Sequence, residues 1–167
     1  MKRRIDRLLR QLDVDLPAPL TVQGLVSALE AARGRRVQLV AMTIVQSGPC
    51  GLLVATPEAD YVLYTRDASR VLQVQTILHE LMHIGLRHTG GTVLPVGRVA
   101  AAFDDVGPEV VLARSPSTFG EQQEHEAELL ATYLGARLVG GDQVGAFDDL
   151  GDATAAVMHR IAATLAD

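Results

Sequence analysis

The feature that most constrains this chain is residues 76–86, which read TILHELMHIGL. In an α-helix four residues advance the chain by about 400°, so His79 and His83 would lie about 40° apart, one turn above each other. Two imidazoles placed in this way can bind one metal ion with bonds of about 2.0–2.1 Å. Glu80 would lie about 100° from His79, beside such an ion, where it can accept a proton from an attacking water.

The H-E-x-x-H spacing is typical of zinc hydrolases, but it can also arise by chance as a polar patch on a helix. The residues around it are apolar, namely Ile77, Leu78, Leu81, Met82, Ile84 and Leu86. A helix that is apolar on nearly all sides is a buried one. Buried histidines and a buried carboxylate need partners, and a metal ion supplies them. The sequence therefore favours a metal site over a polar patch.

The composition indicates one globular domain without a nucleic-acid interface. The chain has 167 residues, of which 48% are hydrophobic and 21% charged, an ordinary balance for a domain with its own core. A net charge of −5, 4% aromatic residues and no Trp argue against binding to DNA or RNA. The single Cys50, predicted to be a small half-buried residue, allows no internal disulfide and fits a reducing compartment. No apolar run is long enough to span a membrane, so we expect a cytoplasmic protein.

Apolar periodicity and turn residues predict an α+β fold. Two helices are expected at residues 2–12 and 22–32, the second capped by Thr21 and ended by Gly34. About three strands are expected at residues 37–42, 50–56 and 61–65, with the last two forming a hairpin. Asp67 or Ser69 would cap the motif helix, which should run from Arg70 to Arg87. Two more helices are expected at residues 121–139 and 153–165.

These elements predict a single domain over residues 1–167. It would comprise N-terminal helices (1–34), a catalytic core (35–139) and a C-terminal helix (140–167). The segment from His88 to Gly120 is rich in Gly and Pro, and a connection this long is usually functional or mobile, so it could restrict access to the site. Short elements are expected in it near residues 93–103 and 110–112. The pair Asp104–Asp105 and His159 are interpreted as solvated residues.

The acidic start of the helix expected at residues 121–139 offers a third metal ligand. Counted at about 100° per residue from Glu124, the apolar stripe falls between about −20° and −80° and comprises Ala127, Ala131, Leu134 and Leu138. Glu124 borders this stripe and is the predicted ligand, with Glu121 as the fallback. Glu128, one turn further on, is predicted to accept the ring N–H of a ligating His. Glu126 falls near 200°, on the outward face, and is predicted to be solvated.

His88 follows His83 by five residues, about 140° further round the helix, so it cannot share the metal while the helix continues. A metzincin would need a third His six residues after the second, and Thr89 stands there instead. His88 is therefore predicted either to cap the helix end or to support a ligating His from behind.

Together these motifs resemble those of the ImmA/IrrE family of bacterial metallopeptidases, across residues 61–139. That family has a strand, a helix with H-E-x-x-H and often a further His five residues on, and later a helix with E-x-E-A-[DN]-x-F-A. The matching pieces are the strand YVLY (61–64), the run from Thr76 to His88, and EHEAELLA (124–131). The chain departs from the pattern at Glu128, where the family has Asp or Asn, at Leu130, where it has Phe, and in lacking a Leu-Met-Pro end.

The resemblance implies a minimal gluzincin-like domain with His79, His83 and Glu124 as ligands of Zn²⁺, or of Mn²⁺, and Glu80 as the general base. Family members typically cut a helix-turn-helix repressor of the XRE type, and some resemble toxin–antitoxin components. The expected function is thus a cytoplasmic endopeptidase with a protein substrate. The alternative is a protein-interaction module that acts by binding and keeps its metal for structure, in a closed site of four protein ligands.

A peptidase of this kind can hold its substrate as an added strand at the edge of a sheet. The candidate edge strand is formed by Tyr61, Val62, Leu63 and Tyr64.

Overall fold

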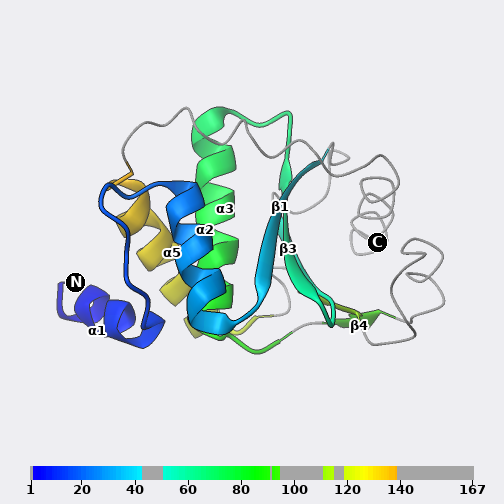
Figure 1. The fold of residues 1–167 in the computed structure, drawn as a ribbon, viewed down its shortest axis with the longest axis horizontal. Helices are drawn as coiled ribbons and strands as arrows, with labels where there is room; N and C mark the ends of the chain where they lie inside the picture. The colour runs from blue at the N-terminus through cyan, green and yellow to red at the C-terminus, as the bar shows by residue number, and fades with distance from the viewer. Residues whose placement is uncertain (1, 43–50, 91, 95–110, 115–118, 139–167) are drawn as a thin grey trace.

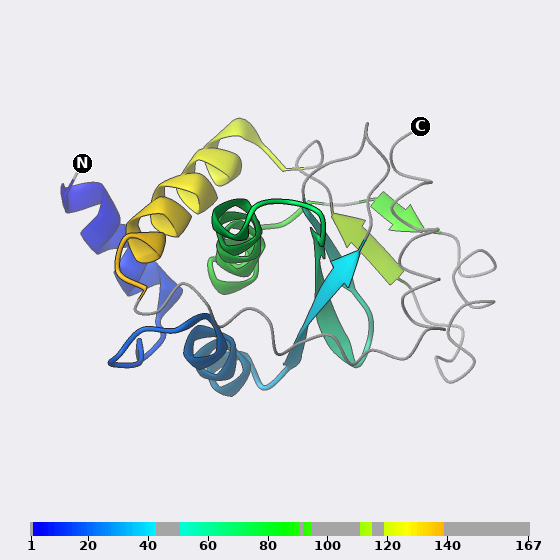
Figure 2. The same ribbon diagram turned by 90° about the horizontal axis from the view of Figure 1, so that it is seen from above.

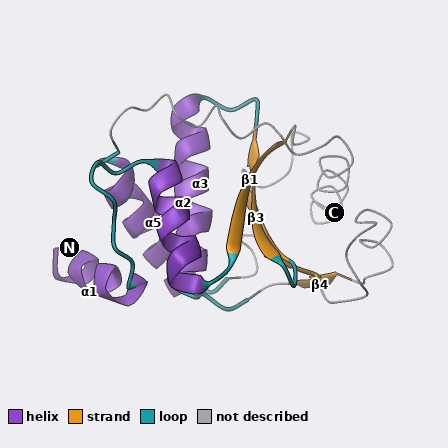
Figure 3. Ribbon diagram, viewed as in Figure 1, coloured by secondary structure: helices purple, strands orange, loops and turns teal. Residues whose placement is uncertain are grey.

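The structure, a computed structural model, describes residues 2–42, 51–90, 92–94, 111–114 and 119–138. The chain order of the described elements is α1 (Lys2–Leu12), α2 (Val22–Arg33), β1 (Arg36–Met42), β2 (Gly51–Ala55), β3 (Ala59–Thr65), α3 (Arg70–Gly85), β4 (Thr92–Leu94), β5 (Val111–Arg114) and α5 (Glu121–Gly135). Figure 3 shows these helices gathered on one side of the sheet, which confirms the predicted α+β class. The helix expected at residues 153–165 lies outside the described residues, as do Cys50, the pair Asp104–Asp105 and His159.

The sheet is mixed, with the strand order β1-β3-β2-β5-β4. The predicted hairpin of β2 and β3 is present, while β1 joins β3 in parallel and β5 and β4 add two short antiparallel strands. Tyr61 of β3 faces Gln38 of β1 on one side and Val54 of β2 on the other. The prediction that Tyr61, Val62, Leu63 and Tyr64 form an edge strand is therefore wrong. The run from Val62 to Tyr64 is buried throughout, as is typical of a central strand.

Helix α3 lies at the centre of the described fold. It packs against β2 and β3 on one side and against α2 and α5 on the other, and α1 lies outermost, on α5 (Figures 1 and 2). Where α3 ends, Gly85 lets the side chains of Leu12 and Leu29 approach its backbone, because a Cβ there would overlap Leu12. The core therefore runs from the sheet through α3 to the N-terminal helices. No helix among the described residues has the length and apolar character that crossing a membrane would need.

Local signals in the sequence account for the ends of the helices. The hydroxyl of Thr21 accepts a hydrogen bond from the backbone N–H of Gly24 at 3.0 Å, and Gly34 ends α2 with a φ of 62°, both as predicted. Ser69, rather than Asp67, caps α3, accepting from the N–H of Leu72 at 3.4 Å. Helix α3 stops at Gly85, two residues before the expected end, and this earlier stop shapes the site described next.

Candidate metal centre

Two helices bring three potential metal ligands together: His79 and His83 from α3, and Glu124 from α5. The Nε2 atoms of the two histidines lie 3.1 Å apart. The carboxylate of Glu124 places Oε2 3.3 Å from His79 Nε2 and Oε1 3.5 Å from His83 Nε2. His83 is buried and the other two side chains are partly exposed, so this group could hold a metal ion that also faces solvent. Glu121, the fallback ligand, is exposed and is not part of the group.

The spacing of these atoms is close to that of ligands around a single metal ion. Ligand atoms bound at about 2.0–2.1 Å to a tetrahedral zinc ion lie about 3.3 Å from one another. The two Nε2 atoms lie 3.1 Å apart, and each lies 3.3 or 3.5 Å from a different oxygen of the Glu124 carboxylate. One ligand atom from each of the three residues falls within 4.8 Å of the others. Oε1 of Glu124 is buried and accepts no hydrogen bond within the described part of the chain. Buried carboxylate oxygens normally have a partner, and a cation between the three side chains would provide one.

The predicted contact between Glu128 and His79 is present. Nδ1 of His79 lies 3.3 Å from Oε2 of Glu128, and because an ionised carboxylate only accepts, the imidazole donates through Nδ1. Gln75 and Thr132 hold this carboxylate by donating to its Oε1 at 3.5 and 3.3 Å. With its proton on Nδ1, His79 directs the lone pair of Nε2 towards His83 and Glu124.

His83 has a corresponding partner in His88. Their Nδ1 atoms lie 3.0 Å apart, and both side chains are buried. If His83 offers Nε2 to a metal, its Nδ1 carries the proton and donates it to Nδ1 of His88. His88 then carries its own proton on Nε2, which lies 3.6 Å from Oε2 of Glu126. Burial lowers the pKa of His88, against the opposing effect of Glu126, and so favours the neutral imidazole that this assignment needs.

The early stop of α3 explains how His88 reaches His83. Arg87 has a φ of 56°, in the left-handed region, and reverses the chain there. The N–H of Arg87 donates to the carbonyl of Ile84 at 3.1 Å, and the N–H of His88 donates to the carbonyl of His83 at 3.0 Å. This pair of bonds is the Schellman motif, here with Arg at the position where Gly is usual. A continuous helix would have pointed His88 about 140° away, whereas the turn folds it back.

The prediction that Glu126 is solvated is wrong. Its side chain is buried, not solvated, at 9% exposure. Helix α1 packs on this face of α5 (Figure 2), where Arg7 lies 3.8 Å from Oε1 of Glu126. Gln122 donates to the same oxygen at 3.0 Å. The helical angle was correct, but the outward face of α5 is covered by a helix from the other end of the chain.

Glu80 is buried, and its side chain lies against strand β2 of the sheet. Burial, together with a smaller contribution from the negative charge of Glu124, raises its pKa to about 8. Gly51 of β2 makes room for this side chain, since a Cβ at that position would stand 2.8 Å from Oε1 of Glu80. A glycine at the start of a strand is the only signal in the sequence that could have pointed to this contact.

Phe119 is a further residue that sequence reasoning missed. Its ring stacks on the imidazole of His83, with centroids 3.8 Å apart and an angle of 21° between the planes. It is buried and lies immediately before the N-cap of α5. Phe119 therefore covers one face of a candidate ligand and excludes water from it, while the His83 edges face His79 and His88.

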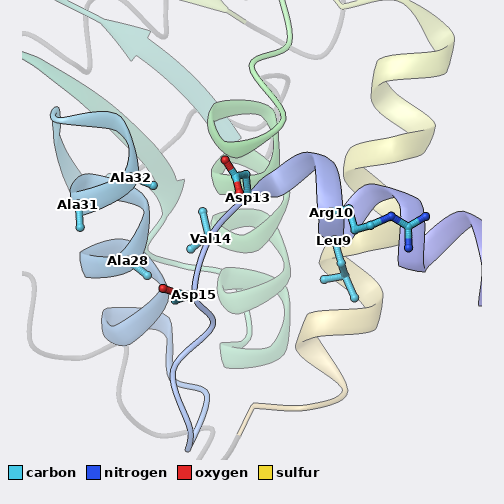
Figure 4. A pocket seen from close by; sticks show the side chains of 8 residues that line it. All are labelled: Leu9, Arg10, Asp13, Val14, Asp15, Ala28, Ala31 and Ala32. Atoms are coloured by element: carbon cyan, nitrogen blue, oxygen red, sulfur yellow. The ribbon is translucent and has the colours of Figure 1, made fainter.

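A hollow of about 760 Å³ lies elsewhere, between α1, the loop after it and α2 (Figure 4). Its lining is Leu9, Arg10, Asp13, Val14, Asp15, Ala28, Ala31 and Ala32. This lining contains no histidine and does not include any of the three candidate ligands. The chemistry of the site thus lies at the contact of α3 with α5 and not in this hollow.

Comparison with known proteins adds no relative. No family description, no curated protein and no solved structure shows significant similarity to this chain.

Proposed function

We propose that this chain is a metal-dependent endopeptidase that cuts a regulatory protein in the cytoplasm. The observation that carries the proposal is the convergence of His79, His83 and Glu124 at a spacing that one metal ion could bridge. The buried carboxyl group of Glu80 lies on the helix of the two histidines. Three protein ligands among the described residues leave a fourth position for water or substrate, which is typical of catalytic sites. A structural site would normally be closed by four, so the geometry favours an enzyme over an interaction module.

Separate side chains would bind the metal ion, orient its ligands and transfer the proton. His79, His83 and Glu124 would bind the ion, and Glu128 and His88 orient the two imidazoles. When bound, a Zn²⁺ or Mn²⁺ ion would polarise the scissile carbonyl, lower the pKa of the attacking water and offset the charge of Glu124. Glu80 would accept the proton of that water and pass it to the leaving amine. Its raised pKa, about 8 in the metal-free protein, suits a group that must both take and return a proton near neutral pH.

The substrate class rests on the resemblance of the two helical motifs to the ImmA/IrrE family. We propose a helix-turn-helix repressor of the XRE type, because members of that family typically relieve repression by cutting such a protein. The predicted role of the segment from His88 to Gly120 in restricting access falls largely outside the described residues.

The test incubates a helix-turn-helix repressor of the XRE type from the same organism with the wild type or with Glu80→Gln, in the presence of zinc or manganese. Gln is nearly the same size as Glu but cannot accept a proton, so the variant should bind metal and repressor without cutting. Exposed His125→Ala, on the same helix as Glu124, is the matched control and should cut normally. Fragments seen with the wild type and the control alone would support a peptidase.

If the protein is instead a binding module, the Glu80→Gln variant should act on the repressor as well as the wild type does. If Glu80→Gln relieves repression in cells as well as the wild type does, and neither produces fragments, then binding is the function and the peptidase proposal fails.

A further inference from the structure

Behind the candidate ligands lies a second layer of buried polar groups, and one of them, Glu126, has no role in the peptidase chemistry described above. Glu126 belongs to α5, and His88 to the turn after α3. A carboxylate that is only 9% exposed needs a reason to be there, because burying a charge is costly unless it is paired. Glu126 has three neighbours at its two oxygens: His88 at Oε2, and Gln122 and Arg7 at Oε1.

A series of contacts connects Arg7 of α1 to the candidate ligand His83. Arg7 approaches Glu126 at 3.8 Å, Glu126 approaches His88 Nε2 at 3.6 Å, and His88 Nδ1 approaches His83 Nδ1 at 3.0 Å. Glu126 faces the one nitrogen of His88 that does not face His83. A negative charge at that place favours a proton on Nε2 and leaves Nδ1 of His88 as an acceptor. The acceptor in turn fixes the proton of His83 on Nδ1 and leaves its Nε2 for a metal.

We propose that Glu126 and His88 act in series as positioning residues, fixing the tautomer and ring orientation of His83 at the metal centre. The stacked ring of Phe119 limits rotation of the same imidazole out of its plane. In many metal sites a carboxylate contacts the ligating histidine directly, as Glu128 does with His79. Here one imidazole is inserted between carboxylate and ligand, which makes His88 obligatory for any effect of Glu126.

This inference rests on the metal centre of the proposed function, but its test needs no proteolysis. The zinc dissociation constant is measured by competition with a chelator, and the Co²⁺-loaded protein gives a visible spectrum that reports ligand geometry. His88→Phe, which fills the space without accepting a hydrogen bond, should weaken zinc binding about 10- to 100-fold and alter the Co²⁺ spectrum. His88→Gln, which can still accept through its amide oxygen, should retain most of the affinity. His125→Ala is the control and should stay within about twofold of the wild type.

The decisive measurement is a double-mutant cycle. Glu126→Ala should weaken zinc binding about tenfold in the wild-type background and by less than about twofold once His88 has been replaced by Phe, which cannot relay a hydrogen bond. Circular dichroism establishes that each variant is folded, and His88→Leu, which neither donates nor accepts, carries the cycle if His88→Phe does not fold. Equal losses from Glu126→Ala in both backgrounds, or a His88→Phe protein that binds zinc as tightly as the wild type, would overturn the proposal. A protein that shows the cycle but cuts no repressor would instead contradict only the peptidase proposal.

Discussion

Gly51 and Glu80 are in such close contact that the strand has no room for a side chain where the carboxyl group lies. A Cβ on residue 51 would stand 2.8 Å from Oε1 of Glu80 and would also collide with the methyl group of Thr76. The orientation of the proposed catalytic base thus depends on a residue that carries no functional group.

Gly51→Ala should therefore displace Glu80 while leaving the ligands on α3 and α5 in place. We expect zinc binding near the wild-type level, repressor cleavage reduced at least about tenfold, and a loss of about 1–3 kcal/mol in the free energy of unfolding from overpacking. Zinc content, cleavage rate and urea denaturation measure the three effects. Gly120→Ala, where an added Cβ meets nothing within 4 Å, is the control. Normal cleavage by Gly51→Ala would mean that the position of Glu80 is not critical.

Substitutions of the glutamates of α5 should weaken zinc binding to different extents, according to the contacts that each side chain makes. Glu124→Ala removes a ligand and should abolish measurable zinc binding, whereas Glu128→Ala removes only the partner of His79 and should weaken it about tenfold. Glu121→Ala, at an exposed position outside the group, should change nothing. Isothermal titration of each variant with zinc tests this order. If Glu124→Ala retained full zinc affinity, the third ligand would have to be a different residue.

The stability of the metal-free protein should fall as pH rises from 5 to 8. The pKa of Glu80 is raised from 4.5 to about 8 by burial and by Glu124, so between these values the folded state holds a proton that the unfolded state releases. Unfolding is then increasingly favoured with rising pH, by at most about 1.4 kcal/mol per pH unit from this group. Glu80→Gln removes the titration and should flatten this part of the curve. Denaturation in a chelator at pH 5, 6, 7 and 8 measures the slope, and equal slopes for both proteins would show that Glu80 is already ionised.

Substitutions of Arg87 test the turn that places His88 beside His83. A residue with a φ of 56° gains from replacement by Gly, so Arg87→Gly should leave the free energy of unfolding unchanged or raise it by up to about 1 kcal/mol. Arg87→Val, β-branched and poorly suited to this region, should lower the free energy by at least about 1 kcal/mol and weaken zinc binding by displacing His88. Urea denaturation and zinc titration of the two variants give the comparison. A stable Arg87→Val protein with normal zinc affinity would count against the role of the turn.

The sequence predicted the parts of this site that depend on one helix at a time. The spacing of His79 and His83 and the position of Glu124 beside an apolar stripe follow from helical geometry alone, and the structure brings all three together. Caps and turns at Thr21, Gly34 and Ser69 are likewise local, and the four helices that the structure describes end within a few residues of their expected limits.

The sequence could not show which segments pack against each face of a helix or each edge of a strand. Glu126 was assigned to solvent because nothing local indicates that α1 packs on α5. The central place of β3 depends on a parallel strand that precedes the hairpin, and apolar residues such as Val62 do not distinguish a central strand from an edge. Gly51 and Phe119 contact the site from segments distant in sequence from the residues that they touch.

The parallel pairing of β1 with β3 has a consequence for the order in which the site can assemble. Strands β2 and β3 are joined by a short turn that Thr56 and Ala59 close with hydrogen bonds, and α3 follows after four residues, so residues 51–85 can come together through local contacts. Such hairpins form within about 1–10 μs, whereas β1 and α5 must each close a longer loop to join them. This early unit already holds Glu80, the glycine beside it and two of the three ligands. The metal site would then be completed only when α5 docks and delivers Glu124, which places metal capture among the last events of folding.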